Sequence, residues 1–479
     1  MSQEEQKGIT VKKDKDASEW YSQVVLKAEL ADYAPVKGFM IIRPNAYALW
    51  ENIRDYFDKR IKKLGVRNAY FPLLIPESFF KKESQHAEGF EPELAWVSRT
   101  DEEDTERLAI RPTSETIMYD SYSKWVRSHR DLPLRLNQWC NVLRWEVKQT
   151  KPFLRTREFL WQEGHCVYET KDECDKEVKW ILGEYKRLCE ELLAIPVVAG
   201  KKTRSETFAG ADYTFTIESF LPEGKAIQMG TSHNLGQGFA KAFGISFLGK
   251  DEKPNTPWQS SWGFSTRLLG ALIMMHGDDN GMIIPPKVAE NKLVIVPIYF
   301  KDKEKVSKKA KELAKTLSKY NPILDDRDEY KPGFKFNEWE MKGVPLRVEI
   351  GPRDIEKKQV VLVRRDNREK IPVKLTKLND TVDEVLEDIQ KSLFEGAKKV
   401  LEKGKDKSVE WKDFVKKIKD RKMVLAPFCL EEECEESIKD ETEGATSRCI
   451  PFEAEKVEEE KCVKCGKDAK AWVYFNNGY

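Results

Sequence analysis

The sequence predicts an α/β protein of three domains, and three observations support this. The chain has 479 residues, more than one hydrophobic core usually organises. Aromatic-rich strands and turns continue as far as Pro285–Pro286, a pair that cannot donate backbone hydrogen bonds. Strand–helix–strand alternation follows, and the last part of the chain carries five of the nine cysteines. We therefore expect domains at residues 1–286, 287–404 and 405–479.

Composition excludes several classes of protein. Basic and acidic side chains number 83 and 82, a net charge of +1, so the chain is not a histone-like polycation. A local basic face can still bind phosphate. The 40% apolar share argues against global disorder. No apolar run reaches the roughly 18–20 residues of a membrane span, and Met1 to Asp16 does not resemble a targeting segment. We expect a cytoplasmic protein with no membrane contact.

A helix is predicted for Asn45 to Leu64 in the first domain. Apolar residues recur on one stripe of this helix: Leu49, Ile53, Phe57, Ile61 and Leu64. Asn45 is expected to cap its start and Gly65 to end it.

The second domain is predicted to alternate strands and helices. Leu293 to Ile298 reads as a strand buried on both faces. A Lys-rich helix is expected over Asp302 to Tyr320, strands over Val344 to Ile350 and Val360 to Val363, and a long amphipathic helix over Thr381 to Lys403.

Two strands between Trp139 and Tyr168 are the most informative stretch. Because strand side chains alternate between faces, Arg144 and Glu146 share one face of the first strand. One face of the second strand carries Phe159, Trp161, Glu163, His165 and Val167. The intervening loop contains Lys148, Lys151, Arg155 and Arg157. A hairpin would make this a wall for a phosphate, an aromatic base and an ammonium group; a half-exposed charged sheet is the alternative.

Three shorter motifs have both structural and functional interpretations. In Arg111-Pro-Thr-Ser-Glu115, the residues Thr113 and Glu115 can start a helix or hold a cationic amine. Arg267 follows Gly263-Phe-Ser-Thr in the first turn of a very apolar helix, where it needs an anionic partner, either a carboxylate or a phosphate.

In Gln228-Met-Gly-Thr-Ser-His233, alternation pairs Thr231 with His233 but leaves Gln228 out of phase. These three side chains meet only if Gly230 breaks the register.

Cysteines in the tail have metal-ligand spacing. Cys429-x(4)-Cys434 is followed, after 27 residues, by Cys462-x(2)-Cys465. Two such pairs match a structural four-thiolate zinc site. Cys449 lies between them and is interpreted as a small buried apolar residue.

These motifs together resemble class II aminoacyl-tRNA synthetases. The segment Gly38 to Pro76 with Pro44, the pair Arg144-x-Glu146 with Phe159, and Gly263-Phe-Ser-Thr-Arg267 resemble that family's three signature motifs. Residues 111–115, 159–165 and 228–233 narrow the resemblance to the prolyl-tRNA synthetase family. The tail cysteines and Tyr479 are similar to its archaeal/eukaryotic-like form.

The resemblance implies a fold, a reaction and a site. The fold is an α+β catalytic domain on an antiparallel sheet, an α/β anticodon-binding domain and a small zinc domain. The reaction attaches proline to tRNA(Pro) through a prolyl-adenylate, with ATP, Mg²⁺ and structural Zn²⁺. The residues implied for catalysis are Arg144, Glu146 and Arg267. The residues implied for ATP are Arg144, Glu146, Arg155, Thr156, Phe159, Gln228, Thr231, Ser265 and Arg267. The residues implied for proline are Thr113, Glu115, Arg144, Trp161, Glu163, His165, Phe208 and His233.

Further expectations concern partners. Glu340, Arg347 and Arg353 are candidates for anticodon contacts, with ion pairs as the structural alternative. The helix at residues 45–64 is expected in a homodimer interface that covers its apolar stripe. Two other functions stay open: a class II synthetase for another small amino acid, and a catalytically silent RNA-binding relative. The presence of Arg144, Glu146 and Arg267 argues against the silent relative.

Overall fold

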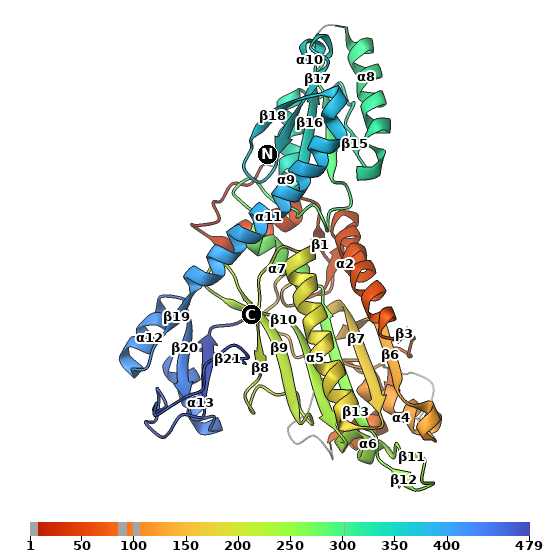
Figure 1. Cartoon of the computed structure of the whole chain (residues 1–479), viewed down its shortest axis with the longest axis vertical. Helices are drawn as coiled ribbons and strands as arrows, with labels where there is room; N and C mark the ends of the chain where they lie inside the picture. Colours follow the sequence, from red (N-terminus) through yellow and green to blue (C-terminus); the bar gives the residue numbers. More distant parts are fainter. Residues whose placement is uncertain (1–7, 85–92, 99–105, 301) are drawn as a thin grey trace.

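The computed structural model describes residues 8–84, 93–98, 106–300 and 302–479 (Figure 1). It has an elongated outline in which a compact α/β unit lies at one end of a larger sheet-based body. The mixed α/β class with a largely antiparallel main sheet is confirmed. No helix within the described ranges is long and apolar enough to cross a membrane.

An eleven-stranded sheet forms the body of the molecule. Its strands, in spatial order, are β19 (Lys405–Lys407), β20 (Met423–Phe428), β22 (Ala471–Asn476), β21 (Thr446–Pro451), β8 (Val198–Lys201), β9 (Tyr213–Phe220), β10 (Ala226–Gly236), β13 (Trp258–Ser265), β7 (Glu158–Tyr168), β6 (Leu134–Leu143) and β3 (Arg67–Asn68). All neighbours pair antiparallel except β19 with β20 and β3 with β6. The predicted hairpin is β6–β7, with Val142 opposite Phe159.

Strand β6 ends earlier than the alternation predicts. It stops at Leu143, so Arg144 and Glu146 follow the strand instead of lying in it. The Arg144 N–H still donates to the Arg157 carbonyl at 2.7 Å, which holds the chain beside β7. Arg144 therefore keeps the side of the sheet that Phe159 occupies.

Helices α2 (Pro44–Lys63), α5 (Lys171–Arg187) and α7 (Arg267–His276) pack with the sheet in the largest core cluster. The stripe on α2 is buried inside this chain: Ile53, Phe57 and Ile61 have no exposed surface. The expectation that a second copy covers this stripe is therefore wrong, because the chain's own aromatic side chains already cover it. Asn45 does not cap α2 either. Arg43 precedes the helix, and the Asn45 amide donates to the Ala28 carbonyl at 3.2 Å.

Smaller elements frame this core. They are α1 (Ala17–Lys27), β1 (Ala31–Tyr33), β2 (Met40–Ile42), β4 (Leu74–Pro76), α3 (Glu77–Ser84), β5 (Leu108–Ile110), α4 (Glu115–Trp125), η1 (His129–Asp131), η2 (Leu188–Leu192), α6 (Gly238–Phe243), β11 (Phe247–Leu248) and β12 (Pro254–Asn255). Of these, α4 and α6 contribute to a second apolar cluster that contains Tyr119 and Phe239.

The second unit has a five-stranded sheet in the order β15-β14-β16-β17-β18 with its own core. Its elements are β14 (Leu293–Pro297), α8 (Lys303–Thr316), η3 (Ser318–Tyr320), β15 (Ile323–Leu324), α9 (Pro332–Lys342), β16 (Leu346–Ile350), α10 (Pro352–Glu356), β17 (Gln359–Arg364), β18 (Lys370–Lys374), η4 (Leu375–Lys377) and α11 (Leu378–Gly404). The predicted elements are present, with α11 three residues longer at its start than expected. In Figure 1, α11 runs from this unit towards the C-terminal strands.

The tail adds α12 (Trp411–Lys419) and α13 (Glu432–Glu441) to its strands. Its sheet is continuous with that of the body, because Ile450 and Pro451 on β21 pair with Lys201 and Gly200 on β8. Gly200 permits this approach, since a Cβ there would lie 2.5 Å from the Ile450 carbonyl oxygen. The tail is thus attached along a strand edge.

Phe57 offers a test of the α2 packing. Its ring lies 5.1 Å from the ring centroids of both Tyr185 and Phe264. We expect Phe57→Ala to lower the free energy of unfolding by about 3–5 kcal/mol, because it removes a fully buried aromatic side chain. Urea denaturation followed by tryptophan fluorescence measures this. Lys59→Ala, on the exposed side of α2, should change it by less than about 0.5 kcal/mol; equal effects would contradict the assignment.

Candidate active site

A cavity of about 360 Å³ lies over the centre of the large sheet, a volume typical of ligand pockets. Most of the predicted site residues line it. They are Thr113, Glu115, Arg144, Glu146, Phe159, Trp161, Glu163, His165, Phe208, Gln228, Thr231, His233, Ser265 and Arg267. Arg155 and Thr156 do not line it; Arg155 is exposed, and the Thr156 hydroxyl donates to the Glu158 carbonyl at 2.7 Å.

Strand pairing brings residues from distant segments into one row across the sheet. His165 on β7 lies opposite Ser261 on β13, Ser261 opposite His233 on β10, and His233 opposite Thr214 on β9. Opposite residues of neighbouring strands share a face. One row therefore forms a continuous polar end of the cavity.

A bulge in β10 brings Gln228 into the cavity. The pairing with β9 shifts register between Gln228 and Gly230, which leaves Met229 as an extra residue. The break in alternation that the sequence required at Gly230 is thus present. Gln228, Thr231 and His233 all line the cavity as a result.

The polar end is built around the buried carboxylate of Glu163, which is 2% exposed. It accepts hydrogen bonds from Ser114 N at 3.2 Å and Gln138 Nε2 at 3.0 Å, and it lies 3.1 Å from His165 Nε2. Burial alone raises its pKa, but the bonds from His165, Ser114 and Gln138 outweigh burial and lower it. Glu163 is therefore a carboxylate at neutral pH.

Two histidines in this end have opposite charge tendencies. Burial lowers the pKa of His165, but the charges of Glu115 and Glu163 outweigh it and raise the pKa. Burial and the charges of His165 and Lys202 lower the pKa of His233 to about 3. His233 therefore stays neutral and adds no positive charge beside the carboxylates of Glu115 and Glu163 at this end of the cavity.

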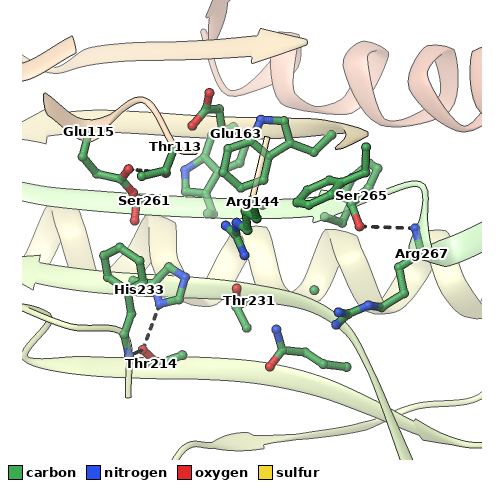
Figure 2. A pocket seen from close by; sticks show the side chains of 18 of the residues that line it. Thr113, Glu115, Arg144, Glu163, Thr214, Thr231, His233, Ser261, Ser265 and Arg267 are labelled. Atoms are coloured by element: carbon green, nitrogen blue, oxygen red, sulfur yellow. Dashed lines mark hydrogen bonds between the residues drawn. The ribbon is translucent and has the colours of Figure 1, made fainter. Parts of the chain in front are cut away.

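Thr113 lies beside Glu115 at the start of α4, and the two side chains are joined by a hydrogen bond (Figure 2). Thr113 is not the helix cap, since Ser114 holds that position without a side-chain capping bond. Figure 2 shows Thr113, Glu115 and His233 at one end of the cavity and Arg267 at the other, with Arg144 between them.

The basic end contains two half-buried arginines with few protein partners. Arg144 Nε donates to the Pro112 carbonyl at 3.4 Å, and Arg267 Nε donates to the Leu154 carbonyl at 3.2 Å. Within the described ranges, neither guanidinium forms an ion pair. Burial and the charges of Arg144 and Arg448 lower the pKa of Arg267 to about 10, and burial lowers that of Arg144. Both arginines are therefore available to an anion.

Aromatic rings flank the first arginine. The Arg144 guanidinium lies 5.4 Å from the ring centroid of Phe159 and 5.5 Å from that of Trp161. A flat ligand can stack beside these groups while an anionic part meets Arg144 and Arg267. The cavity thus combines places for a cation, an aromatic base and an anion.

Sequence reasoning missed several lining residues, including Thr214, Glu206 and Ser261. Ser261 had a signal, because it alternates with Gly263 and Ser265 on one strand. Thr214 had none; its place depends on pairing with His233, whose Nδ1 lies 2.8 Å from its hydroxyl.

The tail cysteines form a compact cluster. The sulfur atoms of Cys429, Cys434, Cys462 and Cys465 all lie within 4.8 Å of one another. The Cys434–Cys462 and Cys429–Cys465 pairs are each 3.7 Å apart, far longer than a disulfide bond of about 2 Å. Cys449 is fully buried outside this cluster, as predicted.

Three parts of the chain match models of known protein families. Residues 96–276 match "tRNA synthetase class II core domain (G, H, P, S and T)", residues 292–385 match "Anticodon binding domain" and residues 411–479 match "Prolyl-tRNA synthetase, C-terminal". A proline–tRNA ligase from Alkaliphilus oremlandii is 52% identical over 97% of this chain and 96% of its own length. The chain belongs to the proline–tRNA ligase family. Members from Clostridium botulinum and Natranaerobius thermophilus are each 51% identical over 97% of this chain, and over 97% and 96% of their own lengths.

In this family member, the residues suggested for the anticodon occupy different settings. Arg347 is buried between two carboxylates, 2.9 Å from Glu340 and 2.9 Å from Glu349. Arg353 is exposed on α10. The ion pairs favour a structural role for Arg347, while Arg353 is accessible to RNA.

The lowered pKa of His233 should make the free energy of unfolding depend on pH. The folded value of about 3 lies below the ordinary 6.5, so the unfolded chain binds a proton that the folded chain rejects, and stability rises with pH between these values. From pH 7 to pH 5 the free energy of unfolding should fall by about 2 kcal/mol more in the wild type than in His233→Asn. Urea midpoints at both pH values measure this. An equal fall in both proteins would reject a neutral buried His233.

Proposed function

We propose that this chain attaches proline to tRNA(Pro) in two steps. Proline and ATP first give prolyl-adenylate and pyrophosphate, and the terminal ribose hydroxyl of the tRNA then attacks the adenylate. The observation that carries this assignment is the distribution of charge along one cavity. Glu115 and Glu163 lie at one end, and the other end holds two arginines that form no ion pair within the described ranges. This arrangement matches an amino acid whose ammonium group lies at the acidic end and whose carboxylate lies beside the phosphate of ATP at the arginines.

Each end has a distinct task in this proposal. Glu115 and Thr113 bind the cationic amine of proline, and the neutral His233 adds no repulsion. Trp161, Glu163, His165 and Phe208 complete the pocket around the ring. Arg144, at the centre, meets the carboxylate of proline and the α-phosphate of ATP, so both reactants are held at one guanidinium.

The ATP end orients the nucleotide. Phe159 stacks on adenine, and Arg267 offsets charge on the phosphates with Ser265, Thr231, Gln228 and Glu146 around them. Mg²⁺ bound with ATP would supply further charge neutralisation on the phosphates. Charge that develops at phosphorus during attack is stabilised by Arg144, so no protein nucleophile is needed. Arg155 and Thr156 lie outside this cavity, which weakens their assignment to ATP.

The three-part division into residues 1–286, 287–404 and 405–479 belongs to the same proposal, with tRNA contacts in the middle part. Arg353 is the best placed of the three base-contact candidates, whereas Glu340 and Arg347 hold each other. A cytoplasmic homodimer is also proposed. Apolar side chains exposed on the β1–β2 hairpin and the first turn of α2 support a second copy: Tyr33, Val36, Ile41 and Tyr47.

Structural Zn²⁺ is proposed for the tail cysteines, and the sulfur spacing tests the fit. A tetrahedral site with Zn–S bonds of about 2.3 Å has sulfur atoms about 3.8 Å apart. The two 3.7 Å pairs agree with this spacing. Bound zinc would tie the α13 region to the loop before β22.

The activity is tested by exchange of pyrophosphate into ATP in the presence of single amino acids. We expect proline to give the fastest exchange, and Arg144→Ala to lower its rate about 10²- to 10³-fold because charge stabilisation is lost. Lys179→Ala, exposed on α5, should leave the rate within about twofold. A faster rate with another amino acid favours the sister synthetase, and no exchange with any favours the silent relative.

The zinc assignment is tested by metal analysis. Purified wild-type protein should contain one zinc ion per chain, and Cys465→Ser should lose most of it and melt at a lower temperature. Cys449→Ala, from the same unit but outside the cluster, should retain zinc. Wild-type protein without zinc, or full zinc content in Cys465→Ser, would contradict the four-cysteine site.

A further inference from the structure

The acidic run Glu431–Glu436 in the tail contains one buried carboxylate. Glu435 is 7% exposed, whereas Glu432, Glu433 and Glu436 face solvent. Its carboxylate contacts residues outside the tail, in the segment that joins β8 to β9. It accepts hydrogen bonds from Thr203 Oγ1 at 3.3 Å and from the Ser205 hydroxyl. Glu435 therefore contacts the catalytic body instead of its own unit.

The same segment has a second attachment to the tail, on β21. The Ser447 hydroxyl lies 2.7 Å from Thr203 Oγ1. The next residue, Arg448, donates to the buried carboxylate of Glu218 through Nε at 3.1 Å and Nη2 at 2.7 Å. Glu218 also accepts from Lys202 Nζ at 3.0 Å. Charge-assisted bonds of this kind, buried and in pairs, are strong and directional.

The segment ends in the wall of the cavity. The Thr207 hydroxyl donates to the Thr203 carbonyl at 2.7 Å, which closes the turn. Phe208 N then donates to Thr214 Oγ1 at 3.0 Å, and Thr214 Oγ1 lies 2.8 Å from His233 Nδ1 (Figure 2). The Phe208 ring packs 4.8 Å from that of His233. A continuous set of hydrogen bonds thus leads from the tail to the acidic end of the cavity.

We propose that Glu435 is a positioning residue for the amino-acid end of the site, and this rests on the proposed function. It holds residues 202–208 in the conformation that presents Glu206 and Phe208 to the cavity. Without this anchor the segment would spend a smaller fraction of time in the binding-competent conformation. The apparent affinity for the amino acid would fall in proportion to that fraction.

The two arginines of the ATP end should be unaffected, because other segments hold them. Arg144 follows β6 and is bonded to Pro112, and Arg267 starts α7 and is bonded to Leu154. Neither bond involves residues 202–208. A positioning role for Glu435 therefore predicts a change that is specific to proline, whereas general damage to the fold would alter all parameters.

The test is proline-dependent pyrophosphate exchange with proline and ATP varied separately. Glu435→Ala should raise KM for proline about tenfold, the usual scale for a hydrogen bond to a charged group. The value of kcat and KM for ATP should stay within about twofold. Glu436→Ala, the exposed neighbour on the same helix, should match the wild type in all three.

Ser205→Ala tests the same contact from the other side. Ser205 is exposed, so this variant folds even if Glu435→Ala disturbs the tail. It should raise KM for proline about fivefold, and the double variant should be no worse than Glu435→Ala alone, as expected for one shared interaction. Unchanged KM for proline in Ser205→Ala, or equal rises for proline and ATP, would overturn the proposal. A wild type that does not activate proline would instead overturn the function itself, and this inference with it.

Discussion

The antiparallel register of the central sheet is the constraint on which the site depends. Side chains alternate with a period of two, so a shift of one strand by one residue would turn all of that strand's lining side chains to the opposite face. The observed register aligns His165, Ser261, His233 and Thr214 across four strands. The next row on the same face contains Glu163, Gly263 and Thr231. Rows of one face follow one another at about 7 Å along the strands.

Electrostatics then divides the cavity into two ends. The carboxylate of Glu163 is fully compensated by hydrogen bonds and by His165, so its negative charge is stable despite burial. Arg144 and Arg267 form no ion pair within the described ranges, and the charge of Arg144 disfavours the charged form of Arg267. Unpaired charge of this kind is costly in the free protein. An anionic ligand offsets that cost, so phosphate binding has a driving force that is already present in the fold.

How far the sequence predicts this arrangement depends on the range of the interactions. Periodicity within a strand is local, and it identified Phe159, Trp161, Glu163 and His165 as one wall. Cysteine spacing identified the tail cluster for the same reason. The break in register at Gly230 was stated only as a condition for Gln228, Thr231 and His233 to meet. A bulge is defined by pairing with the partner strand, and the sequence of one strand does not show that pairing.

Interactions between distant segments were missed or wrong. The apolar stripe of α2 was expected to face a second copy. Its periodicity indicates that this helix face is buried, but it does not indicate which segment or subunit covers it. Thr214 and Glu435 are ordinary polar residues in sequence, and their contacts arise from strands and helices more than 15 residues away. The resemblance of motifs predicted most of the residues that line the cavity, while the contacts that support them became visible only in the fold.

The position of the tail has a structural cause of its own. Strand β8 would be the edge of the catalytic sheet if the chain ended before residue 405, and an exposed edge is a site for unwanted pairing. Strand β21 covers that edge, and its Ser447 and Arg448 then lie beside the residues that continue from β8 into the cavity wall. The strand pairing that covers the edge of β8 therefore also brings the tail into contact with the segment after β8. This arrangement gives the tail, through Glu435, Ser447 and Arg448, direct contact with the segment that leads into the cavity wall.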